Sequence, residues 1–142
     1  MGRSLLGNSL VRKGVAIMEK DHNVEFKKMM RSIYSWNVNH GKAKPPKSEL
    51  PECIKERVRW VIKISKEAPV TFIGSITFAF PDPDNEWKIK KEFEFGETDW
   101  LPITDEYKKY WNEYFSYRSV LEEAVAVALI YGLNDDSEGD AK

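Results

Sequence analysis

The sequence has a single cysteine, and this scarcity excludes several kinds of site. Cys53 has no second thiol with which to pair, so no disulfide can form within the chain. A zinc site built from four cysteines is excluded for the same reason. Because a lone free thiol is typical of proteins in reducing compartments, we predict a cytoplasmic location.

Long apolar runs are also absent. The longest, Ala124 to Tyr131, is much shorter than the roughly 20 residues that a helix needs to cross a bilayer. The first residues include Arg3, Arg12 and Lys13, but polar residues and glycines interrupt the apolar ones. This pattern lacks the continuous apolar stretch of a signal peptide, and we expect no membrane partner.

Glycine and histidine are too sparse to form the usual catalytic and cofactor motifs. The 8 glycines do not cluster, so no phosphate-binding loop or Gly-x-Ser-x-Gly elbow is present. His22 and His40 are 18 residues apart and are interpreted as surface residues. Asp82, Asp84 and Glu86 alternate as calcium ligands do, but two prolines make a turn the simpler explanation. The sequence therefore predicts no catalytic residue, no metal site and no cofactor.

The residues that are abundant indicate one folded domain. Of the 142 residues, 42% are apolar and 13% are aromatic, which suffices for a packed core at this chain length. We predict that residues 19–133 form this domain. Residues 1–18 are interpreted as a peripheral strand or flexible arm, and residues 134–142 as an acidic, disordered tail.

Two helices are predicted in the first half from apolar residues spaced by three and four. The first runs from about Asn23 to Trp36, with an apolar face of Phe26, Met29, Met30 and Ile33. Residues 39–47 are interpreted as a basic connector that contains two prolines. Ser48 is expected to cap the second helix, which Pro69 stops, with an apolar face of Leu50, Ile54, Val58 and Val61.

Alternation of apolar and polar residues predicts an antiparallel hairpin over residues 70–95. From Val70 to Phe80 the even positions are apolar or glycine, and from Glu86 to Phe95 the alternation resumes. The proline-rich residues 81–85 are expected to form the turn between the two strands.

A long helix is predicted after the hairpin. Thr104 is suited to cap it, two acidic residues follow in the first turn, and Gly132 follows its end at Tyr131. The predicted fold is therefore α+β in the order α-α-β-β-α, with the hairpin packed on the C-terminal helix. An extra N-terminal strand is a further option.

Charge is divided unevenly along the chain, although the net charge is only −1. Residues 1–66 contain 15 Lys and Arg against 6 Asp and Glu, whereas residues 67–142 contain 7 against 17. The second predicted helix has a basic stripe on the side away from its apolar face. This stripe and three residues of the long helix are the candidate binding residues: Lys55, Arg59, Lys63, Lys66, Tyr114, Tyr117 and Arg118.

The absence of motifs favours binding over catalysis. The surplus of aromatic residues between Tyr107 and Tyr117 exceeds one helix face and favours a protein–protein interface, with self-association into a homo-oligomer. A compact chain of this kind suits an accessory or inhibitor protein of a phage or mobile element. Two alternatives stay open: a small anionic ligand such as a nucleotide, held by Arg118, the tyrosines and basic residues of the second helix, or nucleic-acid binding through residues 42–66.

Overall fold

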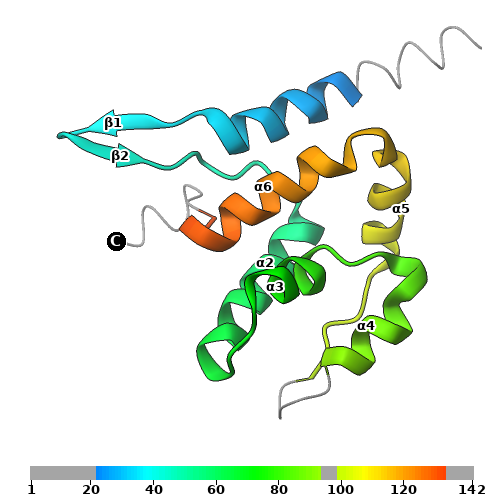
Figure 1. Ribbon diagram of the computed structural model, residues 1–142. Coiled ribbons are helices and arrows are strands. Elements are labelled where there is room, and N and C mark those ends of the chain that lie inside the picture. Colours follow the sequence, from blue (N-terminus) through cyan, green and yellow to red (C-terminus); the bar gives the residue numbers. More distant parts are fainter. Residues whose placement is uncertain (1–21, 94–98, 134–142) are drawn as a thin grey trace, which may run out of the picture.

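The computed structural model describes residues 22–93 and 99–133 (Figure 1). Residues 22–34 form a helix, which leads into a short hairpin of β1 (Asn37–Asn39) and β2 (Lys42–Lys44). The later helices are α2 (Glu52–Glu67), α3 (Phe72–Ala79), α4 (Glu86–Phe93), α5 (Asp105–Glu113) and α6 (Arg118–Tyr131). The protein is thus a mostly helical, small α+β fold. The predictions for residues 1–18 and 134–142 lie outside the described residues.

The helix α2 packs against α3 and α6, which also contact each other. It begins later than predicted, because Pro51 stands at its N-cap and the residue before a proline disfavours helical backbone. Ser48 therefore does not cap this helix. Its backbone N–H donates instead to the carbonyl of Leu133, which joins the start of α2 to the end of α6.

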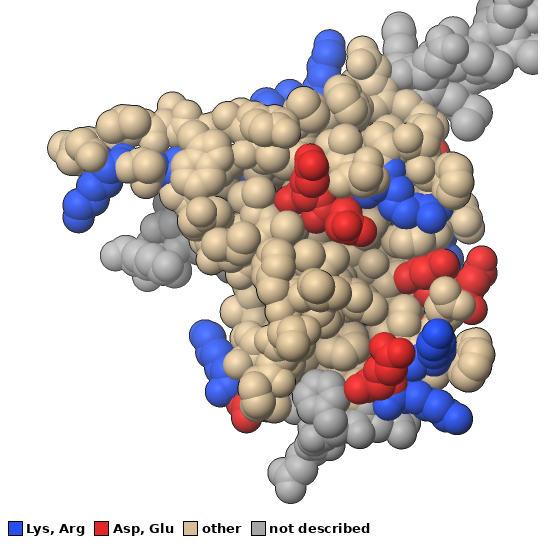
Figure 2. Space-filling model, in the orientation of Figure 1, with Lys and Arg blue, Asp and Glu red and all other residues tan. Residues whose placement is uncertain are grey.

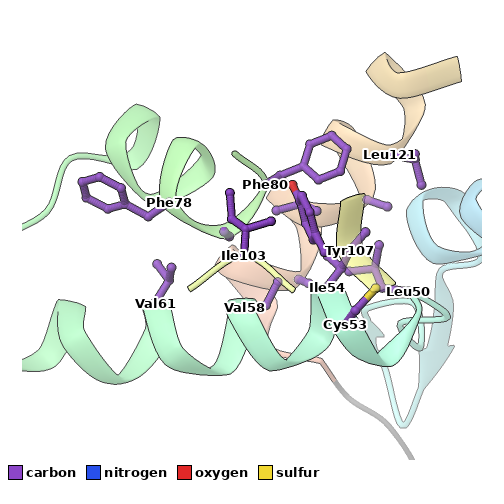
Figure 3. Packing of buried hydrophobic residues seen from close by; sticks show 14 of the residues in the cluster. Leu50, Cys53, Ile54, Val58, Val61, Phe78, Phe80, Ile103, Tyr107 and Leu121 are labelled. Atoms are coloured by element: carbon purple, nitrogen blue, oxygen red, sulfur yellow. The ribbon is translucent and has the colours of Figure 1, made fainter. Parts of the chain in front are cut away.

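The core is made where α2, α3, α5 and α6 meet. Figure 3 shows Ile54, Val58 and Val61 pointing from α2 toward the aromatic rings of Phe78 and Tyr107. These three α2 side chains are almost completely buried, as expected for apolar residues spaced by three and four. The helix α6 closes the core with four buried residues, Leu121, Ala124, Val125 and Ala128.

The predicted strand from Val70 to Phe80 is wrong, because the segment contains the helix α3. Thr71 caps this helix by accepting a hydrogen bond from the N–H of Gly74 at 3.0 Å. Ser75, Phe78 and Ala79 are buried, at spacings of three and four, whereas Ile73 is 77% exposed. In a short segment rich in apolar residues, the helical and strand periods both fit, and packing decided between them.

The second predicted strand is also wrong where it is described. The proline-rich segment is no hairpin turn: Asp82 caps a 3₁₀ turn over Pro83–Asn85 by accepting from the N–H of Asp84, and α4 follows directly. A capping aspartate followed by proline is a known helix start. Ile89 and Phe93, four residues apart, are the buried residues of α4. Residues 94–95 of the predicted strand lie outside the described residues.

The predicted long helix begins and ends where expected but is interrupted in the middle. Thr104 accepts a hydrogen bond from the N–H of Tyr107, and Gly132 follows α6 with a φ of 83°. Between α5 and α6 a 3₁₀ turn over Phe115–Tyr117 changes the chain direction. The break lets Tyr107 reach the core while α6 packs on α2 and α3, so the predicted packing of a hairpin on one C-terminal helix is wrong.

The β-structure lies instead at residues 37–44, in a segment that overlaps the predicted connector of residues 39–47. β1 pairs with β2 in antiparallel register, with Val38 opposite Ala43. His40 and Gly41 form the turn with φ values of 53° and 77°, the left-handed geometry of a type I′ hairpin. Figure 1 shows that the hairpin extends beyond the helices. Among the helices described, none combines the length and apolar character required to span a membrane.

Candidate functional site

Arg57 is a buried charged residue at the centre of the molecule, only 2% exposed. Its Nη2 and Nε donate to the carbonyl of Phe78 at 2.9 and 3.2 Å, and its Nη1 donates to the carbonyl of Leu101 at 2.7 Å. The Phe78 carbonyl belongs to the last turn of α3, where a positive charge also interacts favourably with the helix dipole. Arg57 therefore joins α2, α3 and the loop before α5.

Aromatic rings and one carboxylate complete the surroundings of Arg57. Its guanidinium carbon lies 4.9 Å from the Trp100 ring centroid and 5.3 Å from that of Trp60. Burial lowers the pKa of Arg57 to about 10. Burial acts to raise the pKa of nearby Glu86, but hydrogen bonds from the Ile103 N–H and Trp100 Nε1 outweigh it, so that this pKa is lowered. These contacts fix the core and leave few donors for a ligand.

Cys53 lies beside Arg57 and Tyr107 in a small pocket, where a nucleophile would have acceptor and donor groups nearby. The Tyr107 hydroxyl, however, donates to the Pro81 carbonyl at 2.7 Å. Burial raises the pKa of the Cys53 thiol to about 11, so that it stays protonated at neutral pH. The pocket gives no support to a catalytic thiol.

The reactivity of Cys53 is directly testable with a thiol reagent such as dithionitrobenzoate. We expect at least a hundredfold slower labelling in the native protein than in denaturant, because the protonated, buried thiol reacts only after local unfolding. Labelling at the rate of the unfolded chain would contradict this placement.

The tyrosines predicted to bind a partner lie in a cluster between the first helix and the α5–α6 break. Tyr114 is buried and its ring centroid lies 5.7 Å from that of Tyr117 and 4.9 Å from that of His22. The Tyr110 hydroxyl donates to Glu25 at 3.0 Å. This cluster fastens α5 to the first helix, so most of the aromatic surplus packs inside the protein.

The ring contacts of Arg118 are with residues other than the predicted partners Tyr114 and Tyr117. Its guanidinium carbon lies 3.9 Å from the ring centroid of Trp111 and 4.3 Å from that of Phe115. Its Nε is buried and has no hydrogen-bond partner among the described residues. The arrangement is that of a cation stacked between aromatic rings.

The basic stripe of α2 lies on the outside of the fold. Arg59, Lys63 and Lys66 are exposed, and Arg59 makes a 2.7 Å ion pair with Glu52 on the same helix. Lys55 is half-buried. The ring contacts of Arg118 are with Trp111 and Phe115, and the ion pair of Arg59 is with Glu52. None of the seven predicted binding residues lines the small pocket at Cys53.

The hairpin is the surface that sequence reasoning missed. Every residue of β1 and β2 is exposed, including Val38 at 77%. The base of the hairpin is fixed to the body by Trp36, whose Nε1 donates to the Ile33 carbonyl and whose ring meets Tyr131 edge-on at 5.1 Å. Asn-His-Gly, with glycine at the second turn position, was the local signal for this turn.

The two faces of the hairpin differ in chemistry. Because side chains alternate along a strand, Val38 and Ala43 lie on one face and the flanking residues on the other. The second face consists of the cross-strand pairs Asn37 with Lys44 and Asn39 with Lys42. The hairpin thus has an apolar face and a face of amides and ammonium groups.

The backbone at the middle of each strand is unpaired on its outer side. In a hairpin with a two-residue turn the pair next to the turn is hydrogen-bonded, and hydrogen-bonded pairs alternate with open ones. The N–H and C=O of Val38 and of Ala43 therefore point outward. No described residue hydrogen-bonds to them.

Comparison of the chain with models of known protein families, with curated proteins and with solved structures gave no match.

Proposed function

We propose that this chain is a non-enzymatic binding protein that associates with a second copy of itself through the outer edge of β1. The observation that carries the proposal is the hairpin, a two-stranded sheet with every residue exposed. A two-stranded sheet is marginal in water, and three or more strands are needed for stability of its own. Addition of a strand would supply this stability.

The two edges of the hairpin are not equally suited to pairing. Lysine on an edge strand is a common protection against association, and β2 has Lys42 and Lys44. β1 has the sequence Asn-Val-Asn and no charge. Its uncharged edge favours pairing, whereas two β2 edges would repel each other.

A second copy of β1 is complementary to the first by symmetry. If two β1 strands pair antiparallel about Val38, each valine N–H donates to the valine C=O of the other copy. The result is one four-stranded sheet in the order β2-β1-β1-β2. The two valine side chains then lie side by side on its apolar face, which removes part of their 77% exposed surface from water.

The proposal predicts the effect of replacing Val38 by proline. Proline has no N–H, so both central hydrogen bonds of the dimer are lost, at about 1 kcal/mol each. We expect the dissociation constant to rise by about 30-fold, which corresponds to about 2 kcal/mol. Sedimentation equilibrium over a concentration series measures it.

Ala43→Pro is the matched control, because Ala43 is the residue opposite Val38 and its N–H also points outward. It perturbs the hairpin in the same way but leaves the β1 edge intact, so its dissociation constant should match the unsubstituted protein. A protein that sediments as a monomer at all concentrations, or equal loss of association in both variants, would refute pairing through β1.

The small-ligand alternative has less support. Arg118 stacks between two rings, and the basic residues of α2 lie on the outside of that helix. A role as an accessory or inhibitor protein of a phage or mobile element stays a prediction from the sequence.

A further inference from the structure

We propose that the polar face of the hairpin binds the phosphate backbone of nucleic acid. This face consists of Asn37, Asn39, Lys42 and Lys44, all exposed. No carboxylate in the described part of the chain forms an ion pair with either lysine. This face therefore presents ammonium groups, which attract an anion, and amide N–H groups, which donate to one. Its other polar atoms are neutral amide oxygens.

The positive charge extends beyond the hairpin along the chain. Residues 26–48 contain six Lys and Arg and no Asp or Glu. In Figure 2, Lys and Arg lie at the upper edge of the molecule and at the projecting hairpin, and others lie lower on this face, beside Asp and Glu. Glu25 and Glu49 flank this segment and form ion pairs with Lys28 and Arg31. The two lysines of the hairpin attract a polyanion at long range.

The spacing of the groups suits a row of phosphates. Lys42 and Lys44 point to one face two residues apart, which is about 7 Å along a strand. Phosphates along a nucleic-acid strand repeat at a distance of the same order. Each lysine has an asparagine opposite it, so each cross-strand pair offers one ammonium and one amide donor to a phosphate oxygen.

Phosphate contacts of this kind carry no sequence information by themselves. We therefore infer binding that depends on salt and not on base sequence. An acidic protein surface could also attract lysines, but it lacks a regular row of charges. The charge and spacing of this face favour nucleic acid.

This inference does not depend on self-association. The polar face is present in each copy and lies on the side of the hairpin opposite Val38. Pairing through β1 would leave it open and place two such faces in one sheet. Val38→Pro is then expected to keep DNA binding with a smaller salt dependence, so failure of one proposal can be told from failure of the other.

Fluorescence anisotropy with labelled DNA duplexes of two unrelated sequences tests the proposal. Each phosphate contact contributes about 0.9 to the slope of log K against log salt, so Lys42→Gln with Lys44→Gln should reduce the slope by about 1.8 per chain. The same arithmetic predicts about 60-fold weaker binding at about 0.1 M salt. The two sequences should bind equally.

Lys63→Gln with Lys66→Gln is the control, since it removes two exposed lysines from α2 without touching the hairpin. We expect it to bind DNA as the unsubstituted protein does. No binding to either duplex at low salt, an equal loss in both double variants, or equal affinity for polyglutamate would overturn the proposal. The last result would assign the face to an acidic protein.

Discussion

Replacing Arg57 by methionine is expected to lower the free energy of unfolding by about 3 kcal/mol. Methionine fills much of the space, but it cannot donate to the carbonyls of Phe78 and Leu101, which arginine bonds at 2.9 and 2.7 Å. A buried acceptor that loses its donor costs about 1–3 kcal/mol. The carbonyls of Phe78 and Leu101 lose theirs, and that of Pro102 loses a longer bond of 3.4 Å. Removal of the buried charge offsets part of this cost, because burial also disfavours the guanidinium itself. Denaturant unfolding followed by circular dichroism measures the difference.

Arg59→Met is the matched control, since Arg59 lies two residues away on the same helix and is exposed, with an ion pair to Glu52. Exposed ion pairs contribute little, so we expect a change within about 0.5 kcal/mol. Arg57→Lys should fall between the two, because a single ammonium group cannot reproduce the planar fork of donors. If Arg57→Met is as stable as the control, the buried guanidinium does not hold the core together.

Alkaline pH is the second condition with a large expected effect. Burial raises the pKa of Tyr107 and Tyr110 in the folded protein, and burial raises that of Cys53 to about 11. Below the pKa values of the unfolded chain these groups are protonated in both states, and the free energy of unfolding does not depend on pH through them. Above them only the unfolded chain releases the protons, so stability falls as pH rises.

Each pH unit above the unfolded pKa lowers the free energy of unfolding by about 1.4 kcal/mol for each such group. The loss begins near the ordinary cysteine pKa of 9.0 and steepens above the tyrosine value of 10.0. Arg57 acts in the opposite direction, because its pKa is lowered to about 10 and the unfolded chain holds that proton longer. The net loss is expected to be about 4 kcal/mol at a pH of about 11.

Denaturant unfolding at a series of pH values, with tyrosinate absorbance recorded in parallel, measures this loss. Tyr107→Phe should reduce its pH dependence, because burial raises the pKa of Tyr107 in the folded protein. Stability that stays constant between about pH 9 and 11 would contradict the burial of these groups.

The helical segments with a cap and an apolar stripe were predictable from the sequence. The first helix, the body of α2 and both ends of the α5–α6 segment follow from residues spaced by three and four and from caps such as Thr104. These signals are local, because a helix satisfies its own backbone hydrogen bonds. The break at Tyr114 was not predictable in this way, since the residues around it continue the helical pattern.

The two segments predicted as strands show where local pattern fails. In the predicted strand, Phe72 and Phe78 would lie on the same buried face. In the structure Phe72 is 47% exposed and Phe78 is 5% exposed. What decided for a helix was the Thr71 cap and the contact of α3 with α2 and α6, including the bond from Arg57 to its last turn. Asp82 before Pro83 signals the start of a helix. The sequence prediction gave more weight to the alternation of apolar and polar residues on either side.

The candidate site was less accessible to prediction than the fold. The basic character of residues 42–66 was evident from the sequence, but it was assigned mainly to the stripe on α2. The actual hairpin has asparagines and lysines, which have low strand propensity, so no periodic signal marks it. Only its turn residue Gly41 was a local indication.

The sequence by itself determined the charge of the segment around the hairpin, the presence of a single thiol and the caps of several helices, because these depend on residue identity and near neighbours. The tertiary structure alone decided which segment pairs as strands, where Arg57 is buried and which aromatic residues are left for an interface. Those outcomes depend on contacts such as Ser48 with Leu133 and Arg57 with Leu101, between residues distant in the sequence. No pattern along the chain encodes such a pairing, since it forms only when the helices pack around a shared core.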